Sequence, residues 1–191
     1  MHPRPEVLFL DANVLYSACC RDLLLEASLA GLCHCRWSDL VLAEVRRALV
    51  RHRPELSASR LDRLFQLLAQ ACPDAQVCVR SAPWVAWPAG LDEADRHVVA
   101  SAYAAGADAI ITFNLKHFPS SSLGRLGLKV MSPDQWLAGQ AKTDDVRLSA
   151  LVERCRGRLG HPPLGRSEHL KALRRAGLIR LADHLGHRPT P

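Results

Sequence analysis

The sequence has neither the long apolar segments of a membrane protein nor the paired cysteines of a disulfide-stabilised one. No apolar run approaches the roughly 20 residues that a helix needs to cross a bilayer. The short run 7–10 stops at Asp11, and no small-residue cleavage site follows it. The seven cysteines are odd in number and include no C-x-x-C pair, which favours reduced, structural thiols. We therefore expect a cytoplasmic protein with no membrane-spanning segment.

The sequence also lacks the motifs of several common enzyme and binding-protein classes. Neither G-x-G-x-x-G nor G-x-x-x-x-G-K-[ST] occurs, which argues against a nucleotide-binding loop. Cys33-His34-Cys35 has no matching second pair of ligands, which disfavours a structural zinc site. A phosphohydrolase with a nucleophilic Asp after its first strand usually has the pattern D-x-D and a nearby lysine. Here Asn13 takes the second position, and Lys116 is the only lysine before Lys129.

The net charge of +6 is unevenly distributed. From Arg147 to the end there are ten Lys or Arg residues and three acidic residues, a balance of +7, so the first 146 residues carry −1. Such a basic segment indicates either contact with a polyanion or a solvated helical surface. Composition alone leaves both interpretations open.

Short apolar runs alternate with segments of helical periodicity, the pattern of an α/β fold built on a parallel sheet. The 191 residues, 48% of them hydrophobic, fit one globular domain with a small appendage. We expect strands at 6–11, 76–80, 108–112 and 128–131 and helices at 13–29, 38–51, from 57 to before 73, and 92–105. A loop is expected at 83–88. Ser132 to Gln135 reads as a capping box, followed later by short helices at 144–159, 167–176 and 178–185 that end at Gly160 and Gly177.

Acidic and amide side chains follow the predicted strands. In an open parallel sheet, ligands bind outside the carboxyl ends of the strands, and Asp11 and Asn114 come just after two such ends. The helix that precedes strand 108–112 begins with Asp92 and Asp95, which at i and i+3 share one face. We therefore expect these side chains to converge.

Glu44 joins them by its place on the helix 38–51. The rows 40, 44, 48 and 41, 45, 49 form the apolar stripe, so Glu44 lies on the core-facing side, while Arg46 and Arg47 point to the other face. Because a buried unpaired carboxylate is costly, Glu44 should lie near a cation or be partly open to solvent.

Clustered carboxylates raise one another's pKa values unless a cation lies between them. Mg²⁺ bound through oxygens removes that repulsion and supports phosphodiester cleavage. Each acid alone also has a local explanation: Asp92 as a helix N-cap, Asp11 as a turn residue, and Glu44 as an exposed helical acid. Their joint placement favours a metal-dependent nuclease.

Five motifs in order resemble those of PIN domains, and more narrowly those of VapC-type toxins of toxin–antitoxin pairs. They are Leu-Phe-Leu-Asp11-Ala-Asn13-Val-Leu, Arg36-Trp-Ser38, Leu42-Ala-Glu44-Val, Asp92-Glu-Ala-Asp95-Arg-His97-Val and Ile111-Thr112-Phe-Asn114-Leu-Lys-His117-Phe118-Pro. The resemblance covers about residues 7–136 and implies a three-layer α/β/α fold with a central parallel sheet. It implies a catalytic domain at 1–142, and the helical residues 143–191 follow as an extension.

By this resemblance Asp11, Glu44 and Asp95 are the catalytic metal-binding acids, and Asp92 is a supporting metal ligand. It also implies dependence on Mg²⁺ or Mn²⁺, an RNA substrate, a small antitoxin partner and a homodimer. A PIN scaffold that binds RNA or a protein without cutting is the alternative.

The sequence departs from the family pattern at two places. Asn114 stands where an acid is usual, and His117 stands where a related acid is often found. Thr112 is expected to orient water, and Asn13 and Ser38 to hold the acids by hydrogen bonds or to serve only as local turn and cap residues. His97 is expected on the helix surface.

The basic segment supplies candidate RNA contacts. The residues expected to bind the RNA backbone are Arg154, Arg156, Arg158, Lys171, Arg174 and Arg175. The same helices have an apolar side, so packing on the catalytic domain or closing over the antitoxin remains open.

Overall fold

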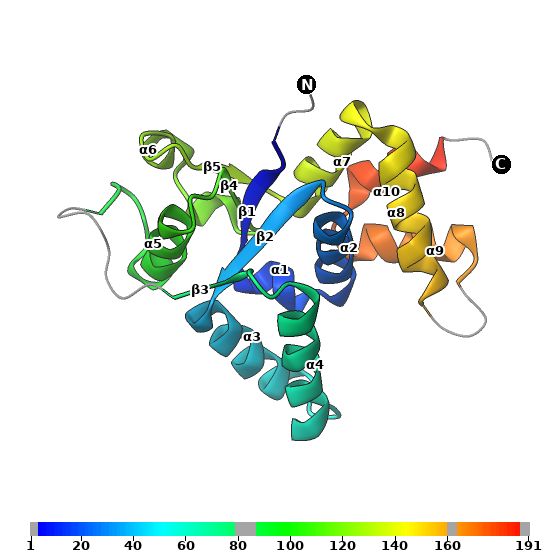
Figure 1. Ribbon diagram of the computed structural model, residues 1–191, viewed down its shortest axis with the longest axis horizontal. Coiled ribbons are helices and arrows are strands. Elements are labelled where there is room, and N and C mark those ends of the chain that lie inside the picture. Colours follow the sequence, from blue (N-terminus) through cyan, green and yellow to red (C-terminus); the bar gives the residue numbers. More distant parts are fainter. Residues whose placement is uncertain (1–3, 79–86, 160–163, 188–191) are drawn as a thin grey trace.

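A five-stranded parallel sheet organises the molecule (Figure 1). The computed structural model describes residues 4–78, 87–159 and 164–187. The strand order is β3-β2-β1-β4-β5 and every neighbouring pair is parallel. The strands are β1 Glu6–Leu10, β2 Cys33–Ser38, β3 Gln76–Val77, β4 Ala109–Ile111 and β5 Lys129–Met131.

Helices cover both faces of this sheet. They are α1 Ala12–Tyr16, α2 Ala18–Leu29, α3 Asp39–His52, α4 Ala58–Ala71, α5 Arg96–Ala104, α6 Ser120–Gly124, α7 Pro133–Thr143, α8 Asp145–Gly157, α9 Arg166–Arg175 and α10 Ile179–Gly186, with 3-10 turns η1 Glu93–Asp95 and η2 Leu115–His117. In Figure 1, α5 and α6 lie on one side of the sheet, and α2, α7 and the C-terminal helices lie on the other. The predicted three-layer α/β/α architecture is confirmed.

The two central strands form the middle of the core. The last three residues of β1 and all of β4 are buried, which explains why both read as continuous apolar runs: a parallel strand covered on both faces has no solvent side. The register pairs Leu10 with Ile111, so both strands end at the same level. Of the predicted strands, 6–11, 108–112 and 128–131 correspond to β1, β4 and β5, and 76–80 to the shorter β3.

The strand β2 was not predicted from the sequence. In β2, buried Cys33, Cys35 and Trp37 alternate with the more accessible His34 and Arg36. That alternation breaks the apolar run on which the other predictions relied. The predicted cap Ser38 lies at the end of this strand and does cap α3.

Two predicted helices are each divided in the structure. The segment 13–29 forms α1 and α2, which meet at Ser17 in an extended conformation. The segment 92–105 starts as η1 and continues as α5 from Arg96. Asp92 and Asp95 therefore do not share one α-helical face, and Asp92 is the cap residue before the turn.

The predicted core stripe of α3 was partly wrong. Val41, Val45 and Leu49 are buried as expected, but Leu40 is 56% exposed. The core row is the single row 41, 45, 49, and Glu44 lies at its border, half-buried rather than enclosed. The predicted stop Gly160 and most of the predicted loop 83–88 lie outside the described residues.

The C-terminal helices share the core of the sheet domain. Their buried apolar side chains belong to the same cluster as β1 and β4: Leu148, Leu151, Val152, Leu173, Leu178 and Leu181. Asp134, in the first turn of α7, accepts hydrogen bonds from the backbone N–H groups of Arg180 and Leu181, both at 3.0 Å. It thus caps the start of α10 from another helix.

The predicted capping box at 132–135 is present at the start of α7. Ser132 Oγ accepts from the Gln135 N–H at 3.1 Å, and Gln135 Oε1 accepts from the Ser132 N–H at 2.8 Å. Among the described helices, not one is both long and apolar enough to cross a membrane.

Candidate active site

The predicted acids surround the carboxyl ends of β1 and β4. These strands are neighbours, and the chain leaves β1 toward β2 on one side of the sheet and enters β4 on the other. This reversal of strand order is where open parallel sheets bind ligands. The backbone N–H of Asp11 donates to Ile111 O at 3.0 Å, which fixes the end of β1 against the end of β4.

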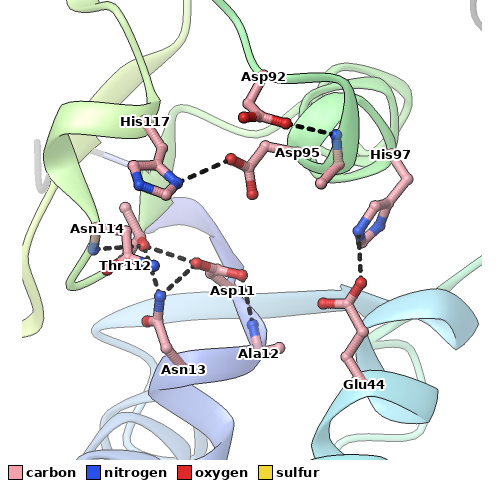
Figure 2. Close-up of polar contacts among 11 residues, drawn as sticks. Asp11, Ala12, Asn13, Glu44, Asp92, Asp95, His97, Thr112, Asn114 and His117 are labelled. Atoms are coloured by element: carbon pink, nitrogen blue, oxygen red, sulfur yellow. Dashed lines mark hydrogen bonds and ion pairs between the residues drawn. The ribbon is translucent and has the colours of Figure 1, made fainter.

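Asp11 is held by three donors (Figure 2). Its Oδ1 accepts from the Ala12 N–H at 2.6 Å, and its Oδ2 accepts from the Asn13 Nδ2 and the Thr112 Oγ1 groups, both at 2.6 Å. The Thr112 hydroxyl in turn accepts from Asn13 Nδ2 and from the Asn114 N–H, both at 3.0 Å. Asn13 and Thr112 thus orient the acid itself, and capping of α1 by Asp11 accounts for only one of its oxygens.

Burial dominates the electrostatics of Asp11. Asp11 is 6% exposed, and this burial raises the pKa of its carboxyl group above the usual value. The nearby negative charge of Asp95 raises the pKa further. The hydrogen bonds from Thr112 and Ala12 and the charge of His97 act in the opposite direction. A cation at this place would favour the ionised form.

Asp95 faces Asp11 from the start of α5, and His117 lies beside it. Figure 2 shows the Asp95 carboxylate pointing toward Asp11, and Asp95 Oδ2 lies 3.2 Å from His117 Nδ1. Asp92 is directed back into its own turn, where its Oδ1 accepts from the Ala94 N–H at 2.9 Å. The N-cap alternative for Asp92 is therefore the contact that the structure contains.

Glu44 approaches the same region from α3, where His97 holds it. His97 Nε2 lies 2.9 Å from Glu44 Oε1, and the guanidinium of Arg47 lies 4.0 Å from the same oxygen. The expectation that Arg47 points away from Glu44 was wrong, because i and i+3 positions are neighbours on a helix. His97 was expected on the helix surface, yet its Nδ1 is buried without a partner among the described residues. Its contact with Glu44 joins α5 to α3, so sequence spacing gave no signal of it.

Asp11, Glu44 and Asp95, called here the acidic site, have a donor set that suits a hard divalent cation. Carboxylate oxygens are the ligands that Mg²⁺ prefers, together with water. Burial, and to a smaller extent the charge of Asp95, raises the pKa of Asp11, and a bound cation would oppose both effects. Among the described residues, no three acidic, histidine or cysteine side chains are grouped so that they could by themselves hold a metal ion. An open site completed by water and phosphate oxygens fits the residues present.

Two further predicted site residues, Asn114 and Ser38, differ in their exposure and contacts. Asn114 directly follows the Thr112 network and is exposed. Ser38 is buried, and its Oγ accepts from the Val41 N–H at 3.4 Å, which is the cap chemistry left open by the sequence.

Four of the six predicted RNA contacts are engaged within the chain. Arg154 and Arg158 both bind the buried Glu26, Arg156 binds Glu153, and Arg174 binds Asp183, with nitrogen–oxygen distances of 2.7 Å in each case. Lys171 and Arg175 are exposed on α9.

Comparison with known proteins agrees with this geometry. The family model for the PIN domain matches residues 7–116, more than half of the 191-residue chain. Over 58 residues the chain is 46% identical to Putative ribonuclease VapC50 of Mycobacterium tuberculosis (strain ATCC 25618 / H37Rv), an alignment that covers 30% of this chain and 34% of that protein. No solved structure gives a significant match. The matched family segment runs from the second residue of β1 to beyond β4 and contains all three members of the acidic site, and the chain belongs to the PIN domain family.

Proposed function

We propose that the protein is a metal-dependent endoribonuclease that cleaves RNA phosphodiester bonds with Mg²⁺ or Mn²⁺ at the acidic site. The observation that carries this proposal is Asp11: a carboxylate 6% exposed, fixed by three donors at the switch point of the sheet and facing Asp95. A buried acid held beside a second acid serves no packing purpose and favours cation binding. The name of the VapC50 relative supports ribonuclease as the reaction.

The contacts of these side chains suggest which would bind the metal and which would position the acids. Asp11, Glu44 and Asp95 would hold the metal, and Asp92, whose Oδ1 is engaged in its own turn, would support it through its other oxygen. When bound, a divalent ion lowers the pKa of water and neutralises charge on the phosphate. Asn13 and Thr112 hold Oδ2 of Asp11, the Ala12 N–H holds its Oδ1, and His97 holds Oε1 of Glu44.

The similarity to VapC50 also supports a proposal about the biological role of the protein. Similarity to a VapC-named protein supports a toxin of a toxin–antitoxin pair that acts in the cytoplasm, forms a homodimer and is inhibited by a small antitoxin. Such an antitoxin would cover the acidic site with a helix or an extended tail that brings Arg or Lys toward Asp11 and Asp95. Light scattering tests the homodimer directly: a strict monomer at high concentration would remove that claim.

Substitution of the acids tests the reaction. Purified protein should cleave single-stranded RNA with Mg²⁺ or Mn²⁺ and stop with a chelator. Asp11→Asn and Asp95→Asn should each lower the rate by orders of magnitude, whereas Asp62→Asn, an exposed acid on α4, should not. Without metal, Asp11→Asn should unfold at the wild-type temperature or above, because a buried charge is removed. Undiminished cleavage by both acid variants would reject the site.

A PIN scaffold that binds RNA or a partner without cutting remains the second candidate, and Asn114 in place of an acid favours it. The two candidates differ in one measurement. If the wild type binds RNA without metal and leaves it intact, the protein is a scaffold. Because the three acids are retained, we expect metal-dependent cleavage instead.

A further inference from the structure

An aromatic side chain is exposed at the edge of the acidic site. Phe113 follows Thr112 directly and precedes Asn114, and it is 37% exposed. Leu115, on the other side of Asn114, is 38% exposed. The exposed part of the ring gains nothing from folding, although the residue adjoins the Thr112 network in the chain, and this exposure needs an explanation.

The position of Phe113 is fixed from two directions. Its backbone N–H donates to Asn13 Oδ1 at 3.1 Å, and the amide of Asn13 also donates to Asp11. On the other side its ring lies against Gly177, in the turn between α9 and α10. A Cβ at position 177 would approach Phe113 Cε1 to 3.1 Å, and Gly177 has a φ of +81°. A residue with a side chain would therefore crowd the ring and strain the turn.

The turn that the ring contacts is flanked by positively charged side chains. Arg175 and Arg180 flank the turn at Gly177 and are exposed. Within the part of the chain that the structure describes, neither guanidinium forms an ion pair. An exposed aromatic ring next to unpaired cations is the combination by which proteins bind single-stranded nucleic acid, the ring stacking on a base and the cations contacting the backbone.

We propose that Phe113 is a stacking platform for one nucleobase of the RNA, next to the phosphodiester that the acidic site cleaves, with Gly177 placing the ring. This inference rests on the proposed ribonuclease function and adds a base-binding subsite to it. The platform selects unpaired RNA, because a base within a duplex already stacks on its neighbours and cannot present a face to the ring.

A scan with abasic nucleotides tests the platform. A single-stranded RNA that the wild type cleaves is prepared as a series, each member lacking one base near the cleavage site. The wild type should lose roughly 5- to 100-fold in cleavage efficiency at one position of the series. Phe113→Leu should lose a similar factor on the intact RNA and lose nothing more when that same base is absent. Phe113→Trp should retain the preference, and Leu115→Ala, a neighbour of equal exposure, should behave as wild type.

Binding measured without catalysis separates this proposal from the proposed function. In Asp11→Asn protein with chelator, fluorescence anisotropy with labelled RNA of about ten nucleotides should show weaker binding after Phe113→Leu. If the wild type cleaves no RNA but this loss of binding occurs, the stacking platform stands and the ribonuclease assignment fails. If cleavage is normal and Phe113→Leu binds and cleaves every member of the series as wild type does, the platform is refuted. Unchanged RNA binding together with weakened self-association would also refute it and identify Phe113 as a protein contact.

Discussion

The hydroxyl of Thr112 links the ends of β4 and β1 to the charge of the acidic site. It is fully buried, donates one hydrogen bond to Asp11 and accepts two others. Because the donated bond stabilises the carboxylate, it opposes the rise in the pKa of Asp11 that burial causes. The hydroxyl therefore favours the ionised form of Asp11 in a place where burial favours the protonated form.

Thr112→Val should move the acid limit of activity upward. Without the hydroxyl, the pKa of Asp11 rises further, so the carboxylate is lost at a higher pH as the solution is acidified. A hydrogen bond to a charged group contributes about 1.5–3 kcal/mol, which corresponds to roughly one to two pH units. Mn²⁺ affinity and cleavage rate, each measured against pH, should show that displacement. Thr143→Val, which removes an exposed hydroxyl on α7, is the matched control. Coincident midpoints for Thr112→Val and wild type would contradict this account of Asp11.

Asn114→Asp tests the missing fourth acid. The backbone N–H of Asn114 is fixed on Thr112 Oγ1, so a carboxylate there adds a full charge beside Asp11 without moving the chain. Metal affinity should rise about tenfold or more, equivalent to about 1.4 kcal/mol, while the metal-free variant should be less stable because a further like charge has been added. Calorimetric titration with Mn²⁺ measures the first effect. Identical titrations would show that position 114 does not contact the metal.

At the scale of elements, one buried acid joins α2 to α8. The Glu26 side chain is 7% exposed, and its two oxygens each lie 2.7 Å from a guanidinium nitrogen, one of Arg154 and one of Arg158. Burial alone raises the pKa of Glu26, but the hydrogen bonds and charges of the two arginines outweigh it and leave the pKa below its usual value. These two arginines, predicted to bind RNA, thus also hold a helix in place.

Glu26→Gln should lower the stability of the protein by about 1–3 kcal/mol. Removing one partner of a buried ion pair can cost more, but Arg154 and Arg158 are about half and two-thirds exposed and regain water. Because the folded-state pKa of Glu26 is depressed, its stabilisation is present above the pKa of the unfolded state and is lost as the pH falls through the folded-state pKa. Urea unfolding at neutral pH and near pH 4 should therefore show a smaller pH effect in the variant.

Glu153→Gln is the appropriate control for that experiment. Glu153 pairs with Arg156 at the same 2.7 Å, but its side chain is 55% exposed and the pair lies within one helix. An exposed i,i+3 pair contributes only a few tenths of a kcal/mol. If both variants lose equally little stability, the buried position of Glu26 does not matter and the argument is wrong.

Which elements could be predicted depended on how each strand is covered. The apolar runs of β1 and β4 are visible because both faces of these strands are buried. β2 was missed because His34 and Arg36 interrupt its apolar residues. Asp11, Glu44 and Asp95 were predicted from their places after a strand and on helices, and their catalytic roles stay predictions. The contact of His97 with Glu44 was not predicted, since it joins α5 to α3 and sequence spacing carries no such information.

At the scale of the whole molecule, the C-terminal helices complete the core and also border the site. Leu148, Leu173 and Leu181 are fully buried in the common cluster, and Gly177 touches Phe113. Of the roles left open for the basic segment, namely RNA binding, packing on the rest of the chain and covering an antitoxin, packing is part of the structure. Truncation before Asp144 should consequently expose apolar surface and cause aggregation, so it cannot isolate a contribution to RNA binding.

Point substitutions at Lys171 and Arg175 can test whether the basic segment contributes to RNA binding. Both side chains are exposed on α9 and form no ion pair within the described part of the chain, so their replacement by Gln leaves the packing intact. If they bind RNA phosphates, the double variant should bind RNA more weakly, and its salt slope should shrink by roughly 0.7 for each phosphate of a single strand that is no longer neutralised. Metal affinity should stay as in wild type. The control is the double variant Arg60→Gln and Arg63→Gln, which removes the same charge from exposed positions on α4. Equal changes in salt slope for the two double variants would show that only net charge matters and that α9 is not a specific RNA-binding surface.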